Sequence, residues 1–148
     1  MEFTPARTGE RTVSTGWLDL VSPWDGELET ARRVIVCGGR RYGERHPELA
    51  LIHRVIASIH DGATVVHGAA RGADVRAGEA ALRRGLWVEA HPADWFRYGN
   101  AAGPIRNQEM INAGADVVIA FPGGRGTADL CRRAEAAGIP VLRVGGSS

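Results

Sequence analysis

Short apolar runs alternate with longer amphipathic segments along most of the chain, from about residue 33 onward. The runs are β-branched or apolar throughout and are bounded by Gly, Pro or Asp, as is typical of strands buried on both faces of a sheet. We predict five such strands, at Val34–Cys37, Thr64–His67, Leu86–Ala90, Asp116–Phe121 and Pro140–Val144.

The segments between these runs have helical periodicity or helix-forming composition. Glu48–His60 carries Leu49, Ile52, Ile56 and Ile59 on one stripe. Further helices are predicted at Ala73–Arg84, Pro104–Ala113 and Thr127–Ala137. Strands that alternate with helices must run parallel, with right-handed crossovers. The predicted fold class is therefore α/β, a Rossmann-like three-layer αβα arrangement with a mainly parallel sheet of five strands or slightly more.

The first thirty residues differ from the rest, because Trp17–Trp24 holds their only apolar cluster. We expect residues 1–30 to form an N-terminal extension, with about the first dozen residues disordered. The tryptophans favour an arm that docks on the domain or on a second subunit. The domain itself is predicted to span residues 31–148.

Composition narrows the class of protein. The 148 residues are 44% hydrophobic and 24% charged, with a formal net charge of +1, so no overall positive field favours nucleic acid or membrane. Two cysteines, no signal peptide and no run long enough to span a bilayer indicate a cytoplasmic protein with two buried thiols. The scattered histidines offer no metal-ligand spacing, so we expect neither a metal nor a cofactor. Glycine, at 20 residues, is the one excess.

These glycines gather in three loops, each of which follows a strand and precedes a helix. The loops are Cys37–Gly43 (CGGRRYG), His67–Asp74 (HGAARGAD) and Phe121–Thr127 (FPGGRGT). Each combines glycine, which exposes backbone N–H groups, with arginine and a helix N-terminus, and this combination binds phosphate. Thr127 is expected to cap the last helix or to donate its hydroxyl to the phosphate. The predicted binding residues in these loops are Gly38, Gly39, Arg40, Arg41, Gly68, Arg71, Gly72, Asp74, Pro122, Gly123, Gly124, Arg125, Gly126 and Thr127.

A single loop of this kind is more often only a tight turn, but three at one edge of a sheet favour a ligand site. None of the loops matches the Walker A pattern, since no lysine follows the glycines. The first loop also lacks the Gly-x-Gly-x-x-Gly pattern, which argues against a standard ATP or NAD site.

The motif Pro-Gly-Gly-x-Gly-Thr at 122–127 resembles the SLOG superfamily, which includes the Lonely Guy phosphoribohydrolases and the Smf/DprA DNA-processing proteins. With the motifs at 38–43, 70–74, 92–95, 98–99 and 102–107, the chain looks like the YspA-related (YpsA-like) SLOG proteins of bacteria and phages. The resemblance covers about Arg33–Val144. It implies a Rossmann-like domain that binds a nucleotide or a nucleotide-derived ligand, often as a homodimer.

The resemblance also bears on catalysis. Arg106-Asn107-Gln108-Glu109-Met110 matches the arginine helix of the phosphoribohydrolases, which implies a site role for Arg106. Their catalytic glutamate falls on Leu130 here, and Asp129 lies one residue earlier, about 100° away around a helix. Either Asp129 substitutes for that glutamate, or the hydrolytic chemistry has lost its carboxylate.

Some residues permit two interpretations. Asp74 is either a carboxylate stabilised by a helix N-terminus or a ligand to ribose hydroxyls. In one interpretation Trp95 and Phe96 cover the end of the sheet, and in the other Trp95 or Tyr98 stacks on a nucleobase. Asn107 could fix a ribose or orient a water, and His67 is expected to be a buried histidine with satisfied hydrogen bonds.

Three functions follow from these residues. The first, which we favour because Leu130 replaces the glutamate, is a sensor or binding module for a nucleotide or nucleotide-derived ligand. The second is an enzyme that cleaves an N-glycosidic bond of a nucleotide, with Asp129, Asp74 or Glu109 as the carboxylate. The third, DNA binding of the DNA-processing type, is disfavoured by the near-neutral charge.

Overall fold

The predicted alternation of strands and helices is present in the computed structural model, which describes residues 10–13 and 25–145. Each predicted strand is found within one residue of its expected bounds. The strands are β1 (Glu10–Val13), β2 (Arg33–Cys37), β3 (Thr64–His67), β4 (Trp87–Ala90), β5 (Val117–Ala120) and β6 (Val141–Val144). The helices are α1 (Asp25–Thr30), α2 (His46–Ala57), α3 (Ala73–Arg83), α4 (Trp95–Tyr98), η2 (Gly99–Ala101, a 3₁₀ turn), α5 (Ala102–Ala113) and α6 (Arg125–Ala136).

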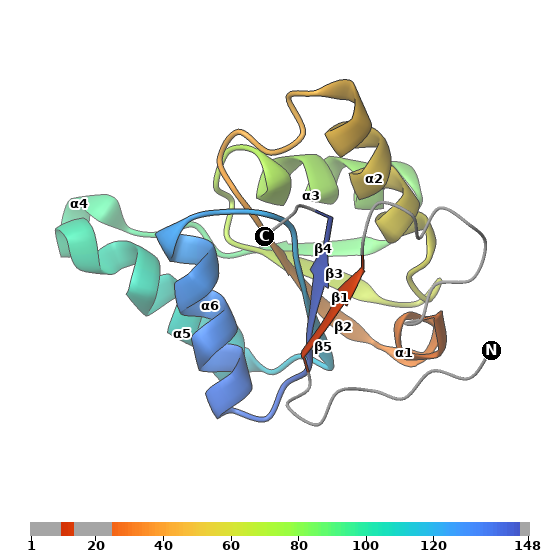
Figure 1. Ribbon diagram of the computed structural model, residues 1–148. Coiled ribbons are helices and arrows are strands. Elements are labelled where there is room, and N and C mark those ends of the chain that lie inside the picture. Colours follow the sequence, from red (N-terminus) through yellow and green to blue (C-terminus); the bar gives the residue numbers. More distant parts are fainter. Residues whose placement is uncertain (1–9, 14–24, 146–148) are drawn as a thin grey trace.

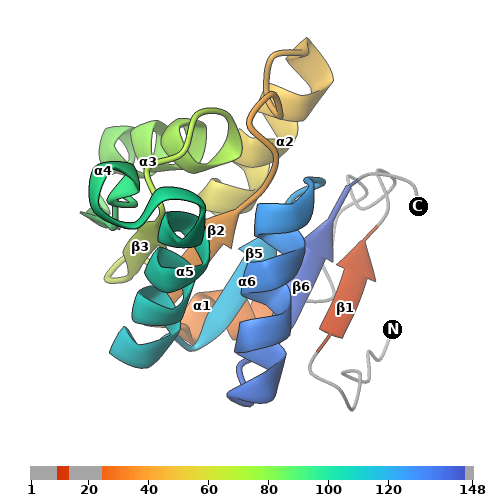
Figure 2. The same cartoon turned by 90° about the vertical axis from the view of Figure 1, so that its left-hand side faces the viewer.

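The strands form one parallel sheet in the order β1-β6-β5-β2-β3-β4. In its registers, Val36 pairs with His67 and Cys37 pairs with Ala120, so the carboxyl ends of β2, β3 and β5 lie side by side. Helices cover both faces, as Figures 1 and 2 show, with α2 and α3 on one side and α5 and α6 on the other. The Rossmann-like three-layer prediction is confirmed.

Side-chain alternation along the strands builds two separate cores. In β2, Val34 and Val36 pack beneath α2 and α3, whereas Ile35 and Cys37 pack beneath α5 and α6. All four are nearly or fully buried, as expected for a central parallel strand. The two thiols, Cys37 and Cys131, are free and buried in the second core, as predicted.

Strand β4 departs from the prediction that every strand is buried on both faces. It lies at the edge of the sheet, and its Trp87 side chain is 73% exposed. An apolar run does not reveal whether its strand has one neighbour or two, because that depends on the order of the strands in the sheet.

The N-terminal prediction also needs correction. Residues Glu10–Val13, which begin within the first dozen residues expected to be disordered, form β1 and pair in parallel with β6 at the other edge. The sheet thus includes part of the segment that the sequence separates from the domain at residue 31. The whole of Trp17–Trp24 lies outside the described residues, so the predicted docking of this segment stays a prediction. Across the described ranges, no helix is long and apolar enough to cross a membrane.

Candidate ligand cleft

The order in which strands are added to the sheet changes direction between β2 and β5, which are parallel neighbours at the centre of the sheet. From β2 the chain continues outward to β3 and β4, and from β5 it continues the other way to β6. Ligands of open α/β sheets bind beyond the carboxyl ends of the strands at such a reversal. A cleft of about 630 Å³ opens there.

Most of the predicted site residues line this cleft. They are Gly38, Gly39, Arg40, Asp74, Trp95, Arg106, Asn107, Gly124, Arg125, Gly126 and Asp129. The structure adds residues that the sequence reasoning did not assign to the site, namely Cys37, Ala70, Asn100, Gly103, Pro104, Met110, Leu130 and Arg132. Asn100 and Arg132 could have been suspected only from the fold, because neither stands in a glycine loop.

The other predicted residues lie outside the cleft lining. Arg41 borders a separate hollow, where its guanidinium pairs with Glu44 at 3.2 Å. Arg71 and Gly72 line another hollow next to the start of α3. Four further predicted residues do not line the cleft and instead make contacts within the loops, namely Gly68, Pro122, Gly123 and Thr127.

The three glycine loops pack directly on one another. Gly39 donates its N–H to the Pro122 carbonyl at 2.8 Å, and its own carbonyl accepts from the Ala73 N–H at 3.1 Å. Gly72 has a φ of +84°, and a Cβ there would collide with the Gly39 carbonyl. A Cβ on Gly123 would collide with the Thr127 hydroxyl and lie 2.8 Å from the Gly39 nitrogen. These glycines therefore let the loops approach closely enough to form one continuous wall.

Helix α6 points its N-terminus at the cleft. Its first helical hydrogen bond runs from Ala128 N–H to the Gly124 carbonyl at 3.0 Å, so the N–H groups of residues 125–127 have no acceptor within the helix. The expected cap at Thr127 is wrong, because α6 begins two residues earlier than predicted, with Gly124 at the N-cap and no side-chain cap. Exposed N–H groups and the helix dipole together favour an anion here.

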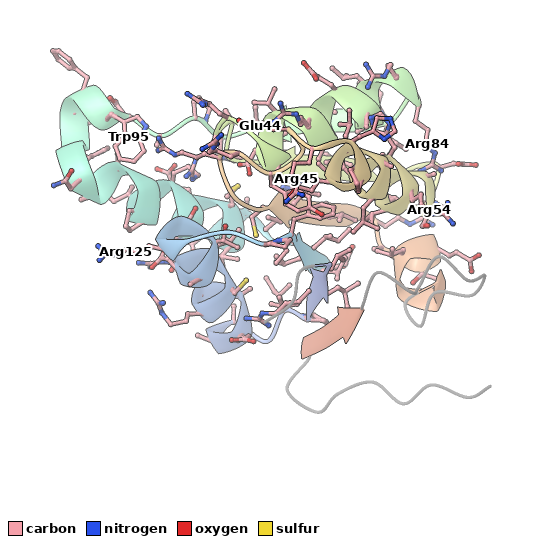
Figure 3. All side chains as sticks on the ribbon, turned by 45° about the horizontal axis from the view of Figure 1, so that its top comes forward. Glu44, Arg45, Arg54, Arg84, Trp95 and Arg125 are labelled. Atoms are coloured by element: carbon pink, nitrogen blue, oxygen red, sulfur yellow. The ribbon has the colours of Figure 1, made fainter. Side chains whose placement is uncertain are left out.

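Two arginines at the cleft have guanidinium groups that are not neutralised. Among the described residues, no carboxylate pairs with Arg125 or Arg40. The guanidinium carbon of Arg40 lies 6.0 Å from the centroid of the Trp95 ring. Arg33, Arg41, Arg84, Arg132 and Arg133, in contrast, are all engaged with carboxylates. Figure 3 shows Trp95 and Arg125 at one end of the molecule and Arg54 and Arg84 at the other.

Arg106 is held at the back of the cleft by backbone and side-chain acceptors. Its Nη1 donates to the Gly68 carbonyl and, at 3.4 Å, to the His91 carbonyl, and its Nε donates to Asn107 Oδ1 at 2.9 Å. Nη2 has no acceptor among the described residues. Because it is not fully buried and Arg106 lines the cleft, this nitrogen is accessible to a ligand. Burial lowers the pKa of Arg106, and the nearby Asp74 carboxylate opposes that shift.

Asp74 is the buried acidic group of the site, with only 5% of its surface exposed. Its Oδ2 accepts from the Gly68 N–H at 2.9 Å. Burial raises its pKa to about 6, although backbone N–H groups and Arg106 act in the opposite direction. His67, beneath the same loop, accepts from the Ala69 N–H at 2.9 Å, and its pKa is lowered by burial, so the expected buried histidine is confirmed.

Asp129 and Leu130 occupy different environments at the start of α6. Asp129 accepts hydrogen bonds from Asn107 at 2.9 Å, Arg133 at 2.8 Å and Arg132 at 3.1 Å. Burial favours a higher pKa for Asp129, but the hydrogen bonds outweigh it and lower the pKa. Leu130 is 1% exposed and packs in the apolar core. Asp129 is thus a fully engaged carboxylate, whereas the apolar Leu130 lies at the cleft floor.

Trp95 forms the outer rim of the cleft. Its side chain is 49% exposed, and its ring edge lies 3.4 Å from the position that a Cβ on Gly103 would take. Helix α4, which carries Trp95, extends beyond the end of the sheet (Figure 1). Within the described residues, no cluster of three or more His, Cys, Asp and Glu side chains could hold a metal ion.

The parallel sheet, the change of strand order at its centre and the glycine-lined cleft define a Rossmann-like α/β protein. Comparison with known families matches residues 32–98 to the YspA, cpYpsA-related SLOG family. The chain is also 43% identical over 121 residues to the Gene 61 protein of Mycobacterium phage D29, an alignment that covers 77% of this chain and 97% of the phage protein. The chain belongs to the YspA, cpYpsA-related SLOG family.

Proposed function

We propose that this protein binds a nucleotide or a nucleotide-derived ligand in the cleft between β2 and β5, as a sensor or binding module of the cytoplasm. The observation that carries the proposal is the α6 N-terminus, where unpaired N–H groups meet the uncommitted guanidinium of Arg125. A phosphate there would gain hydrogen bonds from the backbone and from a bidentate arginine.

The remaining walls of the cleft fit the rest of a nucleotide. Trp95 offers a half-exposed aromatic face to a base, and Arg40 lies over the same ring. Arg106 contributes a second cation, whose free Nη2 opens into the cleft. The family membership supports a nucleotide-related role without specifying the ligand.

Hydrolysis with Asp129 as the general acid is disfavoured by the state of the two residues at the start of α6. A general acid for N-glycosidic cleavage must hold a proton near neutral pH, and the hydrogen bonds to Asp129 lower its pKa instead. Leu130, at the position where the phosphoribohydrolases have glutamate, offers no polar atom. Asp129 is therefore proposed to organise the cleft rather than to transfer a proton.

The test is a thermal-shift screen of the full chain against nucleoside monophosphates, NAD, ADP-ribose and cyclic nucleotides, with chromatography of each mixture. A ligand that binds the native state raises the melting temperature by mass action. We expect a selective shift with the ligand recovered intact, and no shift for the Arg125→Ala variant at the same ligand concentration. Conversion of the ligand to free base and sugar phosphate would make the protein a hydrolase. A panel without any shift would overturn the proposal.

The expected homodimer stays a prediction, which sedimentation of the purified chain with and without ligand tests directly. A steep dependence of oligonucleotide binding on salt would instead favour the DNA-binding alternative.

A further inference from the structure

Two carboxylates line the cleft, and only Asp129 has ion pairs, with Arg132 and Arg133, whereas Asp74 has none among the described residues. Arg40, Arg106 and Arg125 and the α6 N-terminus all favour negative charge. Asp74 lines the same cleft, and it is 95% buried, since only 5% of its surface is exposed. A buried carboxylate is costly unless its oxygens have donors. Backbone N–H groups of its own loop supply donors to Asp74, and its negative charge repels a phosphate, so a part of the ligand other than the phosphate is expected to face it.

The two oxygens of Asp74 have different surroundings. Oδ2 is anchored by the Gly68 N–H at 2.9 Å. The backbone N–H groups of Ala70 and of Asp74 itself also act on the carboxylate. The side chain lines the cleft, and an ionised carboxylate has about four lone-pair sites, so its own loop leaves room for a further donor. The complementary ligand group is a donor, either a hydroxyl or an N–H.

The proposed function indicates which donor this is. It places the phosphate at the α6 N-terminus and the base at Trp95, and the sugar of a nucleotide joins these two parts. Trp95 lies against Gly103 of α5 and Arg40 after β2, and Asp74 lines the same cleft as Trp95 and the α6 N-terminus. The donor that we assign to Asp74 is therefore a hydroxyl of the sugar.

We infer that Asp74 is the specificity-determining residue that binds a ribose hydroxyl, so that the cleft selects ribonucleotides over 2′- or 3′-deoxynucleotides. This inference rests on the proposed function and adds the sugar to it. A site built to hydrogen-bond a hydroxyl rejects the analogue that lacks it, because the buried acceptor is then left without a partner. For a charged acceptor, the expected preference is roughly ten- to hundredfold in Kd.

The experiment is titration calorimetry of the full chain with AMP, GMP, CMP and UMP, each compared with its 2′-deoxy and 3′-deoxy counterparts. We expect one deoxy series to bind roughly ten- to hundredfold more weakly than the ribonucleotides. In Asp74→Asn, the Gly68 anchor can be kept by the amide oxygen, and the ratio should fall close to one while binding persists. Asp61→Asn, at a side chain that is 95% exposed, is the matched control and should keep the ratio.

Other results of this calorimetry would contradict either the role of Asp74 or the proposed function. Equal binding of ribo- and deoxynucleotides by the wild type, or a preference that survives in Asp74→Asn, overturns the inference and leaves the proposed function intact. A preference for AMP over IMP that Asp74→Asn abolishes would assign Asp74 to the base and also overturn it. If no nucleotide binds at all, the proposed function fails first.

A second measurement needs no variant and so covers the case in which Asp74→Asn fails to fold. Because the pKa of Asp74 is about 6, the ribose preference of the wild type should grow between pH 5 and pH 8. Titration of the ligand phosphate cancels in the ratio of ribo- to deoxynucleotide affinities. The charged or titratable groups that act on Asp74 from packed elements are Arg106 of α5 and the Cys37 thiol of β2. A ratio that is constant with pH would contradict the role of the carboxylate.

Discussion

Asn107 Nδ2 donates to Asp129 Oδ2 at 2.9 Å and to the Gly126 carbonyl at 3.2 Å, and so joins α5 to the first turn of α6. The Oδ1 of the same amide accepts from Arg106 Nε at 2.9 Å. One buried amide, 3% exposed, thereby fixes the cation at the back of the cleft and the helix N-terminus at its front.

Asn107→Ala is expected to lower the free energy of unfolding by about 1–3 kcal/mol, because buried hydrogen-bonding groups lose their partner. Asn112→Ala is the matched control on the same helix, since Asn112 is exposed and bonds to Gln108 at 2.9 Å. Urea denaturation of both variants measures the difference. Equal stability of the two variants would show that the Asn107 network contributes nothing.

Asp74 should make stability depend on pH in the direction opposite to an ion-paired carboxylate. Its pKa is raised by burial from 3.8 to about 6, so between these values the native state binds a proton that the unfolded state has released. Proton binding by Asp74 therefore stabilises the native state fully below pH 4. This stabilisation, up to about 3 kcal/mol, is lost as the pH rises through 6. The free energy of unfolding of Asp74→Asn relative to wild type should therefore rise from pH 4.5 to pH 8. A difference that is flat with pH would contradict the raised pKa.

Trp95→Ala should weaken nucleotide binding by roughly tenfold or more, since stacking of a base on an aromatic ring contributes about 1–3 kcal/mol. Trp87→Ala removes a tryptophan that is 73% exposed on β4 and does not line the cleft. Its affinity should match that of the wild type. Fluorescence titration of the two variants distinguishes a stacking platform from a ring that merely covers the sheet end.

Arg125→Ala should reduce affinity for a phosphate-bearing ligand by at least tenfold with little change in melting temperature, because the guanidinium makes no intramolecular ion pair. Arg41→Ala is the informative comparison, since the sequence assigns Arg41 to the site and the structure pairs it with Glu44 outside the cleft. We expect its affinity to be unchanged in calorimetry. A larger loss for Arg41→Ala than for Arg125→Ala would place the phosphate elsewhere.

Substitution of alanine for each of two adjacent glycines should change the stability by different amounts. In Gly123→Ala the added Cβ would collide with the Thr127 hydroxyl and press on the Gly39 nitrogen, so we expect a loss of about 1–3 kcal/mol in stability. Around Gly124 there is nothing within 4 Å of the added Cβ. Thermal melts of Gly123→Ala and Gly124→Ala, made side by side, test whether close loop packing is what requires glycine.

The sheet was predictable from the sequence because β2, β3 and β5 lie at its centre, where burial on both faces leaves uninterrupted apolar runs such as Val34–Cys37. The edges were not. Trp87 on β4 is exposed although its run is apolar apart from Glu89, and β1 was missed because residues 10–13 carry only one strongly apolar side chain, Val13. Edge position follows from long-range strand order, which local patterning does not encode.

The glycine motifs located the cleft, but they did not distinguish arginines that face it from those that do not. Arg40 and Arg41 are neighbours in the sequence, yet Arg40 lines the cleft and Arg41 turns to Glu44. Arg132 was missed because it reaches the cleft only through the rotation of α6. Side-chain direction depends on where each helix begins, and α6 begins two residues before its predicted start.

The parallel pairing of Glu10–Val13 with Val141–Val144 joins the first and last strands of the described fold, since β6 is the sole neighbour of β1 in the sheet. During synthesis on the ribosome, β1 emerges early but has no partner strand until β6 has been translated. The pairings among β2, β3, β4 and β5 can form before that moment, because none of them involves β1 or β6. This edge should therefore be the last part of the sheet to fold, and in hydrogen exchange its amides should be among the first to open.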